Sequence, residues 1–218
     1  SGARFSPDGN VRVAVSDNDA GVTISKTSLV VAEGSTTDSY SVVLNAAPVS
    51  TVTVSMGVSS DVSVTPSEVV FTTSNWKTAV AITVSAVDDE YAEESETHSI
   101  SHTVLSGDAA YAGATFWFGS EEVASNVTVA VYDNDKASVV LSKSGVIGTE
   151  GVSNDTYTVV LSSMPVEHNG RFEDPSASVT VSITGNSQVE VRPSALTFMA
   201  ADWNVAQTVT VVAVAVGR

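Results

Sequence analysis

The chain has 218 residues, no cysteine, and 25 acidic against 9 basic side chains, for a formal net charge of −16. The lack of cysteine excludes disulfides, thiolate metal sites and cysteine nucleophiles. The negative charge repels nucleic acid and anionic membranes and attracts cations. Hydrophobic residues make up 43% of the chain, which is enough for one large core or two ordinary ones. No apolar run approaches the roughly 20 residues of a membrane-spanning helix, so no membrane span is expected.

Residues 1–16 resemble the end of a segment that comes later in the chain. The segment Gly2–Phe5 (GARF) resembles Gly113–Phe116 (GATF), and each precedes a loop, an alternating run and an Asp-Asn-Asp triplet. We therefore expect residues 1–16 to be the C-terminal strand of a preceding repeat. The chain would then be one part of a longer array of repeats.

From Asp17 onward one repeat begins, and from Asp133, 116 residues later, a second one copies it. The matching pairs of segments are Val30–Gly34 and Ile147–Gly151, Tyr40–Leu44 and Tyr157–Leu161, Val64–Ser67 and Val191–Ser194, and the strands after Trp76 and Trp203. This spacing predicts a complete repeat over 17–132 and a second one over 133–218. The second repeat is expected to lack its last strands, to be completed either by downstream sequence or by another chain.

Nearly every segment alternates between apolar and polar residues, which is the period of a half-buried strand. Tyr40, Val42 and Leu44 fall on one face of their run, and the Val and Thr residues that dominate the chain suit pleated surfaces. Turn residues separate the runs at the spacing of an all-β sandwich. The predicted fold is all-β, as tandem immunoglobulin-like antiparallel β-sandwiches.

Two acidic segments follow strand-like runs and suggest a cation site. The triplet Asp133-Asn134-Asp135 comes directly after Val127–Val131, and the loop Asp88–Glu94 is dense in carboxylates. Calcium takes six to eight oxygen ligands, which clustered loop carboxylates can supply, whereas Mg²⁺ demands a tighter octahedron. Two carboxylates at roughly 6 Å and an effective dielectric of about 20 repel by on the order of 3 kcal/mol. A cation is therefore expected to accompany them.

This acidic pattern resembles the Calx-β repeats, named after the calcium-binding domains of the sodium–calcium exchanger. Glu33 stands at the family's Glu-Gly position, and Asp61 lies ten residues before Phe71, where the family has a ligand Asp. The remaining residues fit the family's Asp-Asp-x-x-x-Glu element and its closing acidic triplet, in which Asn134 replaces an acid. The resemblance implies a calcium site with the ligands Glu33, Asp61, Asp88, Asp89, Glu93, Asp133, Asn134 and Asp135.

The second repeat departs from this pattern. It keeps Glu150, but Gln188 stands where the first repeat has Asp61, and Ala215-Val216 stands where it has Asp88-Asp89. No full calcium site is expected there.

Other motifs give weaker indications. Asn126 and Asn154 begin sequons, which would accept glycans in a secretory pathway. His98 and His102 fall on one face of a strand-like run, but no third ligand for zinc is evident. The pair Glu121-Glu122 is expected in a loop, without a cleft of aromatic residues. Since the chain also lacks a nucleophile elbow and a glycine-rich phosphate loop, we do not expect an enzyme.

The sequence favours a calcium-stiffened structural repeat region of a long extracellular or cell-surface protein, such as a fibre, appendage or adhesin stalk. Its partners would be neighbouring repeats of the same protein, with self-assembly into a fibre as a further possibility. Two alternatives stay open. One is a calcium-sensing regulatory module. The other is an adhesion domain that recognises a glycan or protein through the loops Ala110–Phe118 and His168–Asp174, with Phe116-Trp117-Phe118 as the aromatic contact surface.

Overall fold

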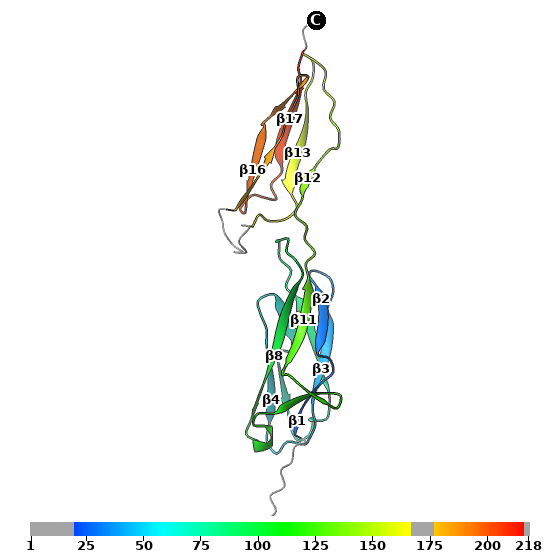
Figure 1. Cartoon of the computed structure of the whole chain (residues 1–218), viewed down its shortest axis with the longest axis vertical. Helices are drawn as coiled ribbons and strands as arrows, with labels where there is room; N and C mark the ends of the chain where they lie inside the picture. The colour runs from blue at the N-terminus through cyan, green and yellow to red at the C-terminus, as the bar shows by residue number, and fades with distance from the viewer. Residues whose placement is uncertain (1–19, 167–176, 216–218) are drawn as a thin grey trace, which may run out of the picture. The chain divides into compact units, whose positions relative to one another are not determined.

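The computed structural model describes residues 20–166 and 177–215, and these residues form an all-β structure (Figure 1). The one helical element among them is a short 3₁₀ turn, Ala109–Tyr111. The predicted fold class, immunoglobulin-like sandwiches built almost entirely of antiparallel strands, is confirmed. No helix in the described part of the chain is long and apolar enough to cross a membrane.

The chain divides into two compact units. The first comprises the described residues up to Val87 together with Glu96–Val131. The second comprises Asp88–Ser95 together with the described residues from Tyr132 onward. The loop Asp88–Ser95 thus belongs to the second unit, although it connects two strands of the first.

The first unit is a sandwich of two sheets (Figure 1). In spatial order, the six-stranded sheet contains β10 (Glu121–Val123), β9 (Thr115–Phe118), β1 (Gly21–Ile24), β3 (Asp38–Leu44), β7 (Val80–Ala86) and β5 (Val62–Thr65). The five-stranded sheet contains β2 (Ser28–Ala32), β11 (Asn126–Tyr132), β8 (Glu96–Ser106), β4 (Val52–Gly57) and β6 (Glu68–Phe71).

The core of the first unit follows from the alternation in the sequence. Every second residue of β3, β4 and β11 is buried, so that each strand gives one face to the core and one to solvent. The aromatic members of this core are Tyr40, Phe71, Tyr111 and Phe116, and Trp76 packs against it while partly exposed. One pair departs from the antiparallel expectation, because β1 pairs with β9 in parallel. Gly21 makes this possible, since a Cβ there would lie 2.7 Å from the Thr115 carbonyl oxygen.

The second unit contains a four-stranded and a two-stranded sheet. The four-stranded sheet contains, in spatial order, β12 (Val139–Leu141), β13 (Asp155–Leu161), β17 (Gln207–Ala213) and β15 (Val189–Arg192). The other contains β14 (Ser178–Ser182) and β16 (Ala195–Met199). Its smaller core gathers around Phe198 and Val209.

The strand pairing of the second unit copies that of the first. β13 pairs with β12 and β17, as β3 pairs with β1 and β7. Tyr157 lies opposite Val209, as Tyr40 lies opposite Ile82. The carbonyls of Trp203 and Trp76 each accept a bond from a β-strand leucine at 3.2 Å. The sequence repeat therefore extends to the hydrogen-bond register.

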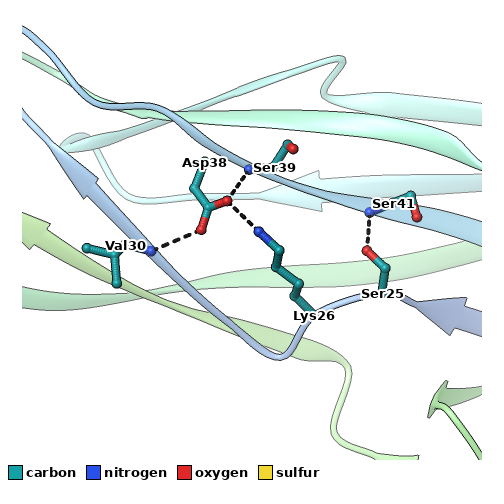
Figure 2. Close-up of polar contacts among 6 residues, drawn as sticks. All are labelled: Ser25, Lys26, Val30, Asp38, Ser39 and Ser41. Carbon is teal, nitrogen blue, oxygen red and sulfur yellow. Dashed lines mark hydrogen bonds and ion pairs between the residues drawn. The ribbon is translucent and has the colours of Figure 1, made fainter.

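A lysine–aspartate contact joins the first strands of each unit, and Figure 2 shows it in the first one. Lys26 Nζ lies 2.5 Å from Asp38 Oδ1, and the Asp38 carboxylate also accepts hydrogen bonds from the amides of Ser39 and Val30. In the second unit Lys143 Nζ lies 2.6 Å from Asp155 Oδ1, and Ile147 and Thr156 donate the amide bonds. These bonds favour the ionised carboxyl, so the lysine contact lowers the pKa of Asp38 and lowers that of Asp155 to about 2.

The Asp155 contact should make a pH-dependent contribution to stability. The pKa of this carboxyl is about 2 in the folded chain against an ordinary value of 3.8. The contact therefore contributes its full stabilisation when the pH is above 3.8, and this stabilisation is lost as the pH falls through about 2. NMR titration of the Asp155 side-chain carboxyl should give a midpoint near 2, and Lys143→Gln should raise that midpoint. A wild-type midpoint at the ordinary value would contradict this role for Lys143.

Candidate metal centre

The structure divides the predicted calcium ligands between the two units. Glu33 and Asp61 lie in the first unit. The other six, from the loop Asp88–Ser95 and from the triplet that follows β11, lie in the second. We call six of the acidic residues in these two segments of the second unit the acidic cluster: Asp88, Asp89, Glu90, Glu93, Asp133 and Asp135.

Hydrogen bonds hold the two segments of the acidic cluster together. The Asp133 carboxylate accepts bonds from the backbone amides of Glu93, at 2.5 Å, and of Asp135, at 2.7 Å. The Asn134 side-chain amide donates to Asp88 Oδ1 at 2.8 Å. A carboxylate at position 134 could not donate this bond, so the departure from an all-acid triplet has a direct structural consequence.

The surroundings of one member of the acidic cluster disfavour its ionised form. The pKa of Asp135 is raised, chiefly because the carboxyl is desolvated, and then because Asp133, Asp88, Asp89 and Glu90 lie near it. Glu90 is a member that the motif match did not select, although it stands next to Asp89 in the same acidic run. A bound cation would reverse this effect by favouring the ionised carboxyl. The donor set is made of oxygens, which fits a hard cation such as calcium.

The loop that carries half of the acidic cluster is fixed to the second unit through its backbone. The amide of Met164 donates to the Glu90 carbonyl at 2.8 Å, and Tyr91 forms a parallel bridge with Met164. The Asp89 carboxylate accepts a bond from the Tyr91 amide at 2.8 Å, which makes a local turn. The position of the acids is therefore set by the chain itself.

Glu33 and Asp61 occupy ordered positions in the first unit. Glu33 is 4% exposed and follows β2, in a turn where Ala32 and Thr36 exchange backbone hydrogen bonds. Gly34 adopts φ +61° in that turn, which explains the Glu-Gly pattern. Asp61 precedes β5, and its carbonyl accepts a bond from the Val87 amide at 3.0 Å. Its carboxylate lies 3.5 Å from His98 Nδ1.

The second repeat shows no comparable gathering among its described residues. Glu150 and Gln188 are both exposed, and the backbone N–H of Gln188 donates to Asn186 Oδ1 in a local turn. The residue Val216 and the triplet Asp17-Asn18-Asp19 lie outside the described residues.

Several other candidates are located by the structure. Asn126 and Asn154 are both exposed, and their glycosylation stays a prediction. His102 does not pair with His98 around a metal: its ring nitrogens contact the Tyr40 hydroxyl and the Ser125 carbonyl, each at 2.7 Å. Burial lowers the pKa of His102, which favours the neutral ring.

The expectation that Glu121-Glu122 lies in a loop is wrong. Both residues belong to β10, because Gly119, at φ +61°, lets the chain reverse and pair with β9. The aromatic contact surface is also reduced. Phe116 is buried in the core and Trp117 is half-buried, which leaves Phe118 exposed. The loop His168–Asp174 lies outside the described residues.

Comparison with known proteins leaves the family open. No family model and no curated protein matches the chain. Among solved structures, it aligns with the apo-form Calx CBD1 domain at 14% identity and a TM-score of 0.36, over 53% of this chain and 99% of that chain. The calcium binding domain CBD12 of CALX1.1 aligns at 14% and 0.36, over 88% and 76%. The E. coli chaperone DraB aligns at 11% and 0.36, over 91% and 87%. Likeness at this level assigns neither a family nor a function.

Proposed function

We propose that the chain is a calcium-binding structural repeat module, of the Calx-β type, in a long extracellular or cell-surface protein. The observation that carries the proposal is the joining of two acidic segments by the Glu93–Asp133 and Asn134–Asp88 hydrogen bonds, in surroundings where desolvation and four neighbouring acidic side chains raise the pKa of Asp135. A carboxyl in such surroundings destabilises the fold when it ionises without a counter-ion. A divalent cation relieves that repulsion, and it needs ligands of the kind that the acidic cluster offers.

Calcium suits the acidic cluster better than magnesium. The acidic cluster offers carboxylates, Asn134 adds an amide oxygen beside them, and both acidic segments are loops. Calcium accepts many oxygen ligands in irregular geometry, whereas Mg²⁺ holds a strict octahedron and retains several waters. In this proposal Asp88, Asp89, Glu93, Asp133 and Asp135 supply charge, and the Asn134 side chain keeps the two segments in register.

The position of the acidic cluster along the chain supports a mechanical role. The chain passes between the two units three times: after Val87, after Ser95 and after Val131. Asp88-Asp89 follow the first passage, Glu93 precedes the second, and Asp133 follows the third. A cation bound by all of these residues would tie the three passages together. Calcium would therefore restrict the segments that connect the units.

This role needs no catalysis, and we propose none. An extracellular setting would supply calcium at the concentrations that structural modules use, since such modules typically bind it with a Kd of roughly 10⁻⁴–10⁻³ M. The partners in this proposal are neighbouring repeats of the same protein, including those of other copies assembled into a fibre. The net charge of −16 disfavours nucleic acid as a partner.

Replacing Asp135 should stabilise the chain when no divalent cation is present. The folded-state pKa of Asp135 is raised, so its ionisation costs stability as pH rises above the ordinary carboxyl range. In EDTA at pH 7, Asp135→Asn should raise the urea midpoint of unfolding of the second unit. At pH 3 the difference from wild type should disappear, because both side chains are then neutral. A lower midpoint for the variant at pH 7 in EDTA would contradict the repulsion argument.

Calcium should make the wild-type chain more stable than Asp135→Asn. The thermal midpoint of the wild-type chain should climb with calcium from EDTA to millimolar concentrations, because calcium binds the folded state alone. Asp135→Asn should lose most of this climb. Glu121→Gln removes an exposed carboxylate from β10 and should keep it. A wild-type midpoint indifferent to calcium, or an equal climb in Asp135→Asn, would refute the site. A half-effect at micromolar calcium would indicate a sensor instead of a structural module.

A further inference from the structure

A second group of metal-ligating side chains lies entirely within the first unit. It consists of Asp61, Glu96 and His98, whose nearest ligand atoms all lie within 4.8 Å of one another. Glu96 and His98 are two residues apart at the start of β8 and point to the same side of the strand. Asp61 reaches them from the turn before β5. We propose that these three residues bind a borderline divalent metal ion, with Zn²⁺ as the best fit.

The contact between His98 and Glu96 is unusual for a hydrogen bond. His98 Nε2 is buried and makes no hydrogen bond, although Glu96 Oε2 lies only 3.1 Å away. The oxygen is therefore close to the nitrogen but displaced from the direction in which the ring would donate. Two atoms that bind the same metal ion also lie close together without a hydrogen bond between them. Zn²⁺ binds nitrogen and oxygen at about 2.0–2.2 Å, so that neighbouring ligands of a tetrahedral ion lie roughly 3.3 Å apart.

The other side of the imidazole ring is already held in place. Ser59 Oγ lies 3.0 Å from His98 Nδ1, and Asp61 Oδ2 lies 3.5 Å from the same nitrogen. A proton on Nδ1 that is shared with these oxygens leaves the Nε2 lone pair free to bind a metal. Metal-binding histidines commonly have such a partner on the second nitrogen. Asp61 can supply the third ligand, since one of its carboxylate oxygens lies within 4.8 Å of the ligand atoms of Glu96 and His98.

The ligand types and their exposure indicate the class of metal. Calcium takes oxygen ligands, whereas imidazole suits zinc, copper, iron and nickel. The His98 side chain is 14% exposed and the Glu96 side chain 49%, so the nitrogen is protected while one side of the group is open to solvent. Water could complete the coordination from that side. This site does not rest on the proposed calcium function, because it contains no member of the acidic cluster.

The test is a ZnCl₂ titration of the whole chain in a non-chelating buffer, followed by calorimetry. Wild type should bind one Zn²⁺ at this site, and His98→Gln and Glu96→Gln should each weaken binding at least tenfold. His168→Gln serves as the control for adventitious histidine binding and should bind as wild type does. Asp135→Asn should also bind as wild type does, because Asp135 belongs to the acidic cluster.

A spectroscopic readout keeps the test decisive even if a variant fails to fold. Zn²⁺ should shift the Nε2 resonance of His98 in long-range ¹H–¹⁵N spectra of the wild-type chain, while the His102 signals stay in place. Equal affinity in His98→Gln, or an unmoved Nε2 resonance at saturating Zn²⁺, would overturn the site. Loss of binding in Asp135→Asn alone would place the zinc on the acidic cluster and overturn it as well.

Discussion

The carboxylates of the acidic cluster repel one another, and the proposed role of this protein depends on that repulsion. The fold brings the loop after β7 and the triplet after β11 together through the bonds that the Glu93 amide donates to Asp133 and the Asn134 side chain donates to Asp88. Desolvation, and then the closeness of the other carboxylates, raise the pKa of Asp135. The hydrogen bonds and the repulsion therefore act against each other. A bound cation would offset the repulsion, so that the hydrogen bonds could persist while the carboxylates stay ionised.

The sheets supply the rigidity that such a site requires. Each strand that leads into the acidic segments buries alternate residues, as β11 does with Val127, Val129 and Val131. The contacts Lys26–Asp38 and Lys143–Asp155 fix the first strands of the two units in equivalent ways. Loops on a fixed scaffold can hold charged groups near one another at a cost that the buried core offsets.

The sequence predicted the strands well, because the alternation of apolar residues with polar ones indicates directly which side chains are buried. The family resemblance implied one calcium site for Asp88–Glu93 and Asp133–Asp135; the structure joins these segments by hydrogen bonds, and calcium binding stays a prediction. The sequence missed the parallel pairing of β1 with β9, which depends on the close backbone approach at Gly21, and the strand at Glu121-Glu122, which depends on the turn at Gly119. It did not anticipate the place of His98, whose partner Asp61 comes from a distant loop. Contacts between distant segments leave no periodic signal in a single sequence.

Hydrogen–deuterium exchange of the wild-type chain, with calcium or with magnesium at equal concentration, tests the central claim most directly. If one calcium ion joins the chain passages, amide exchange should slow together in Asp88–Glu93 and Asp133–Asp135 under calcium. Peptides from β3 should change less, and magnesium should have little effect. Unchanged exchange in the two acidic segments, or equal slowing by both ions throughout the chain, would contradict the account.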